Sequence, residues 1–317
     1  MIALSYEETN PSDIDQSLVE NLLKGIFPDI TADEISFYYH GTYNVFVVKN
    51  KYIFRFPDAS LYNSKGFEMI KNEERLLRAI RGSLSFEIPN PIYCSEDVNN
   101  PFVGYKKIPG ISLSRIYEKT SIEERIKLGL SIGRFLTEYH SPELCLTVSK
   151  DLFGGKRGTP EDHFVSWAKE YEEVKKIVFP RIEKNSIRWL QKVFENYLEQ
   201  KENFQFDPTL VHGDFDTSNI LVNPGTLQIT GIIDFEEARI SDPAQDLIFI
   251  EEGEIFSNAV IKTYQGNIDS SLEDRIRFYF CRAGTAYILY GVKNNIPQLA
   301  NYGKLMIKKR MNMIPYF

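Results

Sequence analysis

The order of the predicted elements favours an α+β fold with two lobes, a small β-rich lobe followed by a larger helical one. Three stretches near the N-terminus, residues 35–39, 43–48 and 52–56, are rich in β-branched and aromatic residues. From about residue 122 onward, apolar residues recur mainly at helical spacing. The chain has 317 residues with 43% hydrophobic and 26% charged content, which is ordinary for a globular protein of one large domain or two medium ones.

The N-terminal elements are predicted from a change of period along the chain. Apolar residues at helical spacing predict a helix over 13–24, with Asp13 as its N-cap. Short turns at 40–42 and 49–51 join the three strands into an antiparallel meander. A helix over 67–80 and short strands near 92 and over 102–108 follow, and Pro109-Gly110 then breaks the pattern. We therefore expect lobes of residues 1–108 and 109–317.

The second lobe is predicted to be mostly helical. Helices are expected over 122–139, 161–178 and 186–198. Two short strands, 219–223 and 228–233, interrupt them and turn at Pro224-Gly225. Helices resume over 243–250 and dominate to the end of the chain.

Charge and composition argue against several classes of function. Lys plus Arg number 37 against 44 for Asp plus Glu, a net charge of −7, which argues against nucleic acid or an anionic membrane as partner. No apolar run approaches the ~18 residues of a membrane span. The first residues lack the pattern of a signal peptide, and the three cysteines are far apart. We expect a cytoplasmic protein.

The segment 211–222 concentrates the chemistry. An apolar strand enters a polar loop that returns to another apolar strand, so Asp214 and Asn219 are expected near each other at the mouth of a hairpin. Asp234 follows at the exposed end of a buried strand. Their oxygen atoms suit Mg²⁺ shared with phosphate groups. In phosphoryl transfer, one carboxylate orients the attacking hydroxyl while an Asn and an Asp hold the metal.

These motifs resemble those of the aminoglycoside phosphotransferase and choline kinase superfamily. The run His-Gly-Asp with Asn219 five residues after the Asp is followed by Ile-Ile-Asp-Phe and by Ser-Asp-Pro-x-x-Asp-Leu. The spacing and the N-terminal lobe are most similar to the aminoglycoside 2''-phosphotransferases, over nearly the whole chain. The resemblance implies a bilobal protein-kinase-like fold, with a nucleotide-binding N-terminal lobe and a catalytic and substrate-binding C-terminal lobe.

The resemblance also implies roles for individual residues. Asp214 corresponds to the catalytic Asp, and Asn219 and Asp234 correspond to the ligands of Mg²⁺. His212 is expected to support the loop by hydrogen bonding. Asp242 precedes Pro243 and is expected to cap a helix, while Asp246 either orders the loop or contacts the substrate.

The nucleotide site departs from the family pattern at one position. Arg55 stands at the end of the third strand, where family members carry a Lys that pairs with the phosphates and with a helix Glu. Arg keeps the charge but donates in a fork, so the replacement is not conservative. Glu73 resembles its helix partner, with Glu74 and Glu68 as alternatives. Gly41 would lie in the loop over the phosphates.

The segment 102–110 resembles the hinge that meets the purine. Lys106 and Ile108 would contribute main-chain groups to the base. Tyr105 falls where a bulky side chain restricts access to an adenine pocket, which in the family accompanies preference for GTP. The donor is therefore expected to be ATP or GTP.

An unusual run of acids follows the proposed metal ligand. Residues 234–254 hold eight acids and only Arg239 as a basic residue, a charge of −7. Such a surface would attract a cationic, hydroxyl-rich acceptor, although it is alternatively an ordinary solvated face. The residues expected to contact the acceptor are Asp216, Glu236, Glu237, Asp246, Glu251 and Glu252.

Together these features predict a small-molecule kinase that phosphorylates a hydroxyl of an aminoglycoside, an antibiotic-resistance type of enzyme. A second hypothesis changes the acceptor to a macrolide, a choline-like alcohol, a sugar or an amino-acid alcohol. A third, suggested by Arg55 and the single glycine at 41, is a nucleotide-binding protein with weak or no catalysis. The presence of Asp214, Asn219 and Asp234 together argues against the third.

Overall fold

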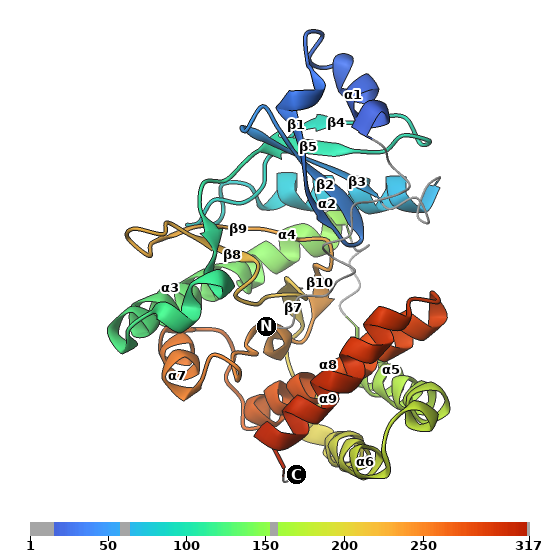
Figure 1. The fold of residues 1–317 in the computed structure, drawn as a ribbon. Coiled ribbons are helices and arrows are strands. Elements are labelled where there is room, and N and C mark those ends of the chain that lie inside the picture. The colour runs from blue at the N-terminus through green and yellow to red at the C-terminus, as the bar shows by residue number, and fades with distance from the viewer. Residues whose placement is uncertain (1–15, 58–63, 153–157, 316–317) are drawn as a thin grey trace. The chain divides into compact units, whose positions relative to one another are not determined.

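The computed structural model describes residues 16–57, 64–152 and 158–315 (Figure 1). The chain forms two compact units, which we call the β unit, Met1–Leu113 with Ile220–Glu236, and the helical unit, Ser114–Asn219 with Glu237–Phe317. Asp13, the predicted N-cap, lies outside the described residues. The assignment of nucleotide binding to 1–108 and of catalysis to 109–317 stays a prediction.

The β unit is built on a five-stranded antiparallel sheet. Its strands, in spatial order, are β1 (Ile35–His40), β2 (Tyr43–Val48), β3 (Tyr52–Pro57), β5 (Val103–Lys106) and β4 (Pro91–Cys94). Lys49 and Asn50, at the β2–β3 turn, have φ values of 52° and 49°. Two successive residues with positive φ are typical of a tight hairpin turn that matches strand twist. The predicted meander is confirmed.

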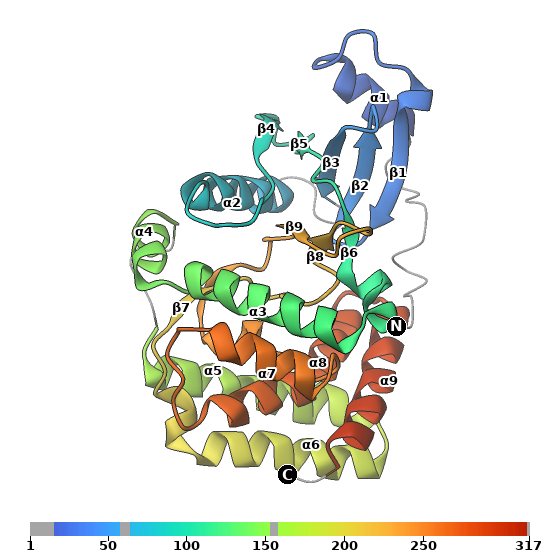
Figure 2. The same cartoon turned by 90° about the vertical axis from the view of Figure 1, so that its left-hand side faces the viewer.

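The two faces of this sheet are covered by different helices. Val19 and Leu23 of α1 (Gln16–Lys24) pack in one buried cluster with Phe54 of β3. Ile70 of α2 (Ser64–Ile80) packs in another cluster with residues of β2 and β5, and Figure 2 shows α2 lying beside the sheet. Because side chains alternate along a strand, Arg55 points to the face opposite Phe54, the face that α2 covers.

A second, three-stranded sheet completes the β unit in the order β6 (Ile111–Ser112), β8 (Ile220–Val222) and β9 (Ile229–Ile232). Gly110 enters it with a φ of 137°, and a Cβ there would lie 2.9 Å from the carbonyl oxygen of Val222. Only glycine fits such a backbone without strain. The predicted break at Pro109-Gly110 is therefore the point where the chain passes to the β8–β9 hairpin.

The helical unit contains two short strands, β7 (Thr209–Val211) and β10 (Arg239–Ser241), which pair antiparallel. Figures 1 and 2 show α8 lying against α9, and Figure 2 shows α3 beside α7. The helices are α3 (Ile122–Tyr139), α4 (Pro142–Leu152), α5 (Pro160–Glu173), α6 (Lys184–Glu199), α7 (Glu254–Thr263), α8 (Leu272–Lys293) and α9 (Pro297–Met313). No described helix is long and apolar enough to cross a membrane.

Most predicted elements of the helical unit are confirmed, with one clear exception. The helix expected over 161–178 is α5, which continues as a π-helical turn over Val174–Val178. The helix expected over 243–250 is wrong, because only a 3₁₀ turn forms over Pro243–Asp246. Asp242 is the N-cap of that turn and Asp246 is its last residue. Both carboxylates are buried: that of Asp242 lies against Arg275, and that of Asp246 accepts from the backbone N–H of His212.

Candidate active site

The loop between β7 and β8 carries the first group of predicted site residues. Asp214 is exposed, whereas Asn219 is 7% exposed. The amide Nδ2 of Asn219 donates to the carbonyl oxygen of Asp214 at 2.8 Å and lies 3.2 Å from its Oδ2. The two side chains are therefore close, as expected. Since the amide nitrogen is used here, Asn219 would offer its oxygen to a metal ion.

Buried Asp246 holds this loop in place through hydrogen bonds. Its carboxylate is 0% exposed and accepts hydrogen bonds from the backbone N–H groups of His212 at 2.6 Å and Gly213 at 2.9 Å. His140 Nε2 lies 3.0 Å from the same carboxylate, and His140 Nδ1 lies 2.9 Å from Tyr264 Oη. Burial acts to raise the pKa of Asp246, but His140 and the backbone donor of His212 outweigh it and lower that pKa.

The burial of Asp246 bears on its two predicted roles. A carboxylate with no exposure and three hydrogen-bond partners is placed to order the loop, which favours that role over contact with a substrate. Gly213 has a φ of +85°, and a Cβ there would lie 2.5 Å from the carbonyl oxygen of Glu237. The sharp turn before Asp214 therefore depends on a glycine as well as on Asp246.

Asp242 has a structural role as a cap. Its Oδ1 accepts from the backbone N–H of Ala244 at 3.0 Å, which confirms the predicted N-cap. Its Oδ2 lies 2.9 Å from Arg275 Nε and accepts from the hydroxyl of Tyr279 at 3.0 Å. Burial raises the pKa of Asp242 to about 6, although Arg275 opposes the shift.

The second group of predicted site residues meets in the β unit around Arg55. Arg55 Nη1 donates to Glu73 Oε1 at 2.5 Å. Arg55 Nη2 donates to Asp234 Oδ1 at 2.8 Å and to Glu236 Oε2 at 2.9 Å. Of the other candidate partners, Glu74 instead pairs with Lys71, and Glu68 is exposed. The structure thus brings Arg55 together with Glu73 and with the proposed metal ligand Asp234.

The charges of this cluster do not cancel. The three carboxylates share one guanidinium, whose carbon lies 4.1 Å from the centre of the Tyr43 ring. Burial acts to lower the pKa of Arg55, but Glu73 and Asp234 raise it well above its usual value. The pKa of Glu73 is raised by burial, against the opposing effect of Arg55. With all four groups ionised, the cluster has two negative charges in excess.

Asp234 has further features that fit a metal ligand. Its φ is +71°, an uncommon conformation for a residue with a side chain, and such strain is frequent at functional sites. The described residues contain no cluster of three or more His, Cys, Asp or Glu side chains that could hold a metal. Mg²⁺ characteristically uses one or two carboxylates with phosphate oxygens and water, so a partly exposed carboxylate such as that of Asp234 suits that ion.

The other residues predicted to bind nucleotide also lie in the β unit. Gly41 is buried in the β1–β2 turn, where its N–H donates to the carbonyl oxygen of Tyr43 at 3.0 Å. Tyr105 is 6% exposed and packs with Tyr43. Lys106 is exposed at the end of β5, whereas Ile108 is buried and contacts Gly231 of β9.

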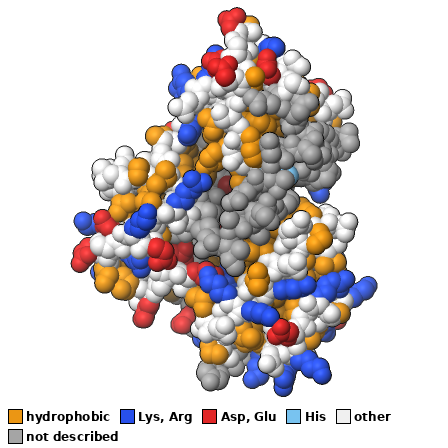
Figure 3. Space-filling model, viewed as in Figure 1, with side chains coloured by type: hydrophobic (Ala, Val, Ile, Leu, Met, Phe, Trp, Pro, Cys, Tyr) orange, Lys and Arg blue, Asp and Glu red, His pale blue; other side chains and the backbone are white. Residues whose placement is uncertain are grey.

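Several carboxylates of the acidic run pair with cations from elsewhere in the chain. Glu236 bonds to Arg55, and Glu251 pairs with Lys309 and with Arg310. Figure 3 shows Lys and Arg side chains gathered on the drawn face of the helical unit. Counting charges within residues 234–254 leaves out cations that are distant in sequence, so Glu236 and Glu251 are less available to a cationic acceptor than the sequence suggests. The role of the acidic run in acceptor binding stays a prediction.

Three predicted acceptor contacts remain at least partly accessible. Asp216 is exposed and accepts hydrogen bonds from Ser218. Glu237 is exposed and half-buried Glu252 accepts from the hydroxyl of Thr217 at 3.1 Å. Burial raises the pKa of Glu252 to about 7, while the hydrogen bond from Thr217 opposes the rise.

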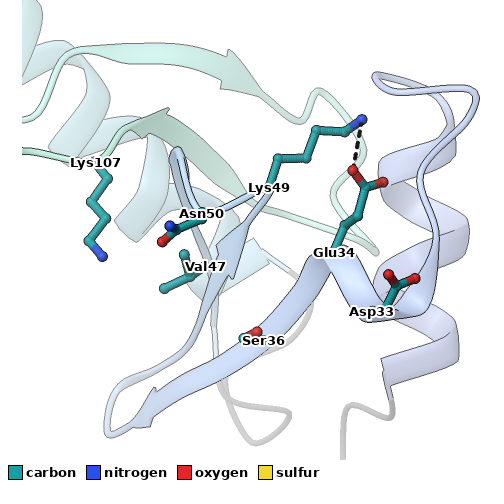
Figure 4. Close-up of a pocket in the computed structure, with 7 residues that line it drawn as sticks. All are labelled: Asp33, Glu34, Ser36, Val47, Lys49, Asn50 and Lys107. Atoms are coloured by element: carbon teal, nitrogen blue, oxygen red, sulfur yellow. Dashed lines mark ion pairs between the residues drawn. The ribbon is translucent and has the colours of Figure 1, made fainter.

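A hollow elsewhere on the β unit contains none of the predicted site residues. Figure 4 shows it beside the start of β1 and the β2–β3 turn, where Lys49 Nζ lies 3.4 Å from Glu34 Oε1. Lys107 also lines it. It is open, and its charged groups are surface side chains.

Sequence reasoning missed the contact between Arg55 and Glu236. The two residues are 181 positions apart, and no spacing rule relates β3 to the segment after β9. The only available signal was the Arg itself, because a guanidinium can serve more acceptors than an ammonium in a fixed fork.

Comparison with known proteins identifies related chains. A model of the family described as "APH: Phosphotransferase enzyme family" matches residues 34–275. Acyl-CoA dehydrogenase family member 10 of Mus musculus is 25% identical over 251 residues, 74% of this chain but 22% of the relative. Family member 11 of Pongo abelii is 24% identical over 276 residues, 83% of this chain and 32% of the relative. The chain thus spans a fifth to a third of these curated relatives.

Solved structures share the fold over nearly the whole chain. The GDP complex of aminoglycoside 2'-phosphotransferase-IIIa has a TM-score of 0.80 at 24% identity, covering 94% of this chain and 98% of that one. Macrolide 2'-phosphotransferase from Brachybacterium faecium has a TM-score of 0.69 at 16% identity, covering 92% and 97%. These likenesses confirm the predicted α+β, kinase-like fold.

Proposed function

Because this chain belongs to the phosphotransferase enzyme family, we propose that it transfers the γ-phosphoryl group of a nucleoside triphosphate to a hydroxyl of an aminoglycoside. Membership confirms the predicted superfamily and the predicted class of enzyme, a phosphotransferase with an alcohol group as acceptor. The donor, the metal and the acceptor are the parts that we propose.

The observation that carries the proposal is the arrangement of Asp214. Its carboxylate is exposed, while the loop that bears it is fixed by Asn219 on one side and by buried Asp246 on the other. A carboxylate held in this way can accept a hydrogen bond from an incoming hydroxyl and orient its oxygen toward phosphorus. We assign Asp214 as the catalytic residue.

The β unit would bind the nucleotide. Arg55, anchored by Glu73, would contact the phosphates, and Gly41 would lie in the loop beside them. Tyr105, Lys106 and Ile108 would meet the base, with Tyr105 favouring GTP. The GDP complex of a structural neighbour supports a nucleotide here.

Asp234 and Asn219 would hold Mg²⁺, and the excess negative charge around Arg55 supports a cation at this position. When bound, the ion would neutralise charge on the phosphate oxygens. The chain's own contribution is to hold the carboxylate of Asp234 and the amide oxygen of Asn219, both hard oxygen donors that suit this ion.

The acceptor is proposed from the structural neighbours together with the remaining acids. A solved neighbour is described as a complex with GDP and kanamycin, at a TM-score of 0.79. Asp216, Glu237 and Glu252 are the acids that would contact ammonium groups of such an acceptor. Glu251 and Glu236, which pair with cations of this chain, would contribute little.

A second candidate is an acceptor without several positive charges. The pairing of the acidic run inside the chain favours it, as does the fold shared with a macrolide 2'-phosphotransferase. The curated relatives are named as acyl-CoA dehydrogenase family members, so we include a hydroxylated acyl thioester in the same test.

The test is nucleotide consumption by the purified protein over aminoglycosides, macrolides, simple alcohols and a hydroxylated acyl thioester, with ATP and GTP in separate series. Asp214→Asn is the matched control for background hydrolysis. Consumption that depends on an aminoglycoside and on Asp214 supports the proposal. Consumption that only a neutral or anionic alcohol stimulates replaces the acceptor, and none with any acceptor rejects the proposal.

A further inference from the structure

Arg55 uses one nitrogen for two different carboxylates. A guanidinium carries two N–H groups on each terminal nitrogen. Those of Nη2 bond to Asp234 at 2.8 Å and to Glu236 at 2.9 Å, while Nη1 bonds to Glu73 at 2.5 Å. The Arg55 side chain is 6% exposed, so these contacts are shielded from water. Asp234 and Glu236 therefore share one charged donor group.

Asp234 and Glu236 differ in their proposed roles and in their exposure. Asp234 is the proposed metal ligand and its side chain is 34% exposed, whereas that of Glu236 is 17% exposed. An oxygen that bonds strongly to a guanidinium is a poorer donor to a cation, because the two positive charges compete for it. A metal bound by Asp234 would therefore compete with Arg55 for this carboxylate, whose Oδ1 bonds to Nη2.

We propose that Glu236 is a positioning residue, which holds the Arg55 guanidinium in place while Asp234 turns to the metal. By sharing Nη2, Glu236 weakens the hold of Arg55 on Asp234 and lowers the energy needed to release it. After release, Glu236 and Glu73 still fix the guanidinium from both ends of its fork. This inference rests on the proposed function, because it assumes that Asp234 binds the metal of a nucleotide complex.

A lysine would not need such a partner. An ammonium is a compact charge on a flexible stem, and it does not present two separate nitrogens to carboxylates on opposite sides. The role of Glu236 is therefore linked to the presence of Arg55. A general effect of negative charge on metal affinity would instead be the same with Lys at position 55.

The experiment measures binding of Mn²⁺ in the presence of GDP, by electron paramagnetic resonance of the free ion, and needs no acceptor. Glu236→Gln should weaken Mn²⁺ binding roughly 5–20-fold, the loss expected when one charge-assisted contact is removed. Glu96→Gln is the matched control, since Glu96 in the same unit pairs with Lys71 and its side chain is 83% exposed. It should change binding less than about twofold.

The combination with Arg55→Lys makes the test specific. In that background Glu236→Gln should change Mn²⁺ affinity less than about twofold, because the shared donor is gone. Equal losses in both backgrounds would show a plain charge effect and overturn the inference, as would wild-type affinity in Glu236→Gln. If Glu236→Gln does not fold, Glu236→Asp replaces it, because this change keeps the charge but shortens the side chain. Its Mn²⁺ affinity should fall less than that of Glu236→Gln, and wild-type Mn²⁺ affinity in Glu236→Asp would count against the inference. Failure of GDP itself to bind to the wild type would instead reject the proposed function.

Discussion

In the helical unit one buried carboxylate holds a loop by accepting backbone N–H bonds, whereas in the β unit one buried guanidinium is shared by three carboxylates. Asp246 bonds to the main chain of His212 and Gly213, so its partners are fixed parts of a turn. Arg55 bonds to three carboxylate side chains at this cluster, and each of these can rotate. The same kind of charged contact therefore serves two different purposes.

The difference suggests which part responds to ligands. Releasing Asp246 would leave two backbone donors buried without a partner, which is unfavourable. Releasing Asp234 from Arg55 leaves Glu73 and Glu236 on the guanidinium, and a cation can compensate the freed carboxylate. We infer that the loop around Asp214 is preorganised, while the Arg55 cluster rearranges when nucleotide and metal bind.

The largest effect on activity is expected from a change of Asp214, which lies exposed in the preorganised loop. Asp214→Asn keeps the size of the side chain but removes the anion that orients the hydroxyl, so turnover should fall by about 10²–10⁴. Nucleotide affinity should change little, because the contact is to the acceptor. Asp216→Asn, in the same loop, should alter the acceptor KM rather than kcat. Nearly full turnover in Asp214→Asn would remove the catalytic assignment.

Breaking the anchor should be the next most severe change. Asp246→Asn keeps an acceptor oxygen but places an amide nitrogen toward the backbone donors and His140. The free energy of unfolding should fall by roughly 2–4 kcal/mol, and kcat by about 10–100-fold as Asp214 loses its position. Thermal denaturation and kinetics measure the two. Asp207→Asn, an exposed acid of the same unit, is the control.

If Asp246→Asn lowered stability with no loss of kcat in the folded fraction, the loop would be held by other contacts. We would then have no evidence that Asp246 preorganises the loop around Asp214.

The residues of the loop around Asp214 could be predicted from the sequence better than those of the Arg55 cluster. Asp214, Asn219 and the Asp242 cap follow from local spacing, and local spacing fixes turns and caps. Asp246 was recognised, but its role stayed open because burial depends on α3 and His140, more than a hundred residues away. The prediction of a helix over 243–250 was wrong for a related reason. The pattern of apolar residues does not show that the carboxylate of Asp246 bonds to the backbone after β7.

The Arg55 cluster was only half predictable. Its pair with Glu73 was expected only from the family resemblance, with Glu74 and Glu68 left as alternatives, and the fold selects Glu73. Glu236 was assigned to the acceptor instead, since charges counted along the sequence look unpaired. Pairing in space with Arg55, Lys309 or Arg310 requires the fold.

The responsive cluster should show a smaller effect than the rigid loop when it is altered conservatively. Arg55→Lys keeps the charge, but a single ammonium lacks the forked guanidinium that bonds to Glu73 at one nitrogen and to Asp234 and Glu236 at the other. Nucleotide affinity should fall about tenfold, the equivalent of one charged hydrogen bond, with kcat much less affected. Isothermal titration with GDP and ATP measures this. A fall in kcat alone would mean that Arg55 acts on the transition state instead.

The smallest expected effect concerns Glu252, a half-buried acid hydrogen-bonded to Thr217 of the rigid loop. Its pKa rises from 4.5 to about 7, chiefly through burial. The folded state therefore holds a proton that the unfolded state has already lost, and the stability due to this group is complete below about pH 4.5 and is lost as pH rises through about 7.

Glu252→Gln removes this titration while keeping an acceptor for the Thr217 hydroxyl. The free energy of unfolding of the wild type should therefore decline more steeply than that of the variant between about pH 5 and about pH 8, by roughly 1–2 kcal/mol over the interval. Urea denaturation at several pH values measures the difference. Glu254→Gln, an exposed acid at the start of α7, should keep the wild-type slope. Equal slopes for all three proteins would mean that Glu252 ionises freely, and that the segment beside the loop is more open to water than its burial indicates.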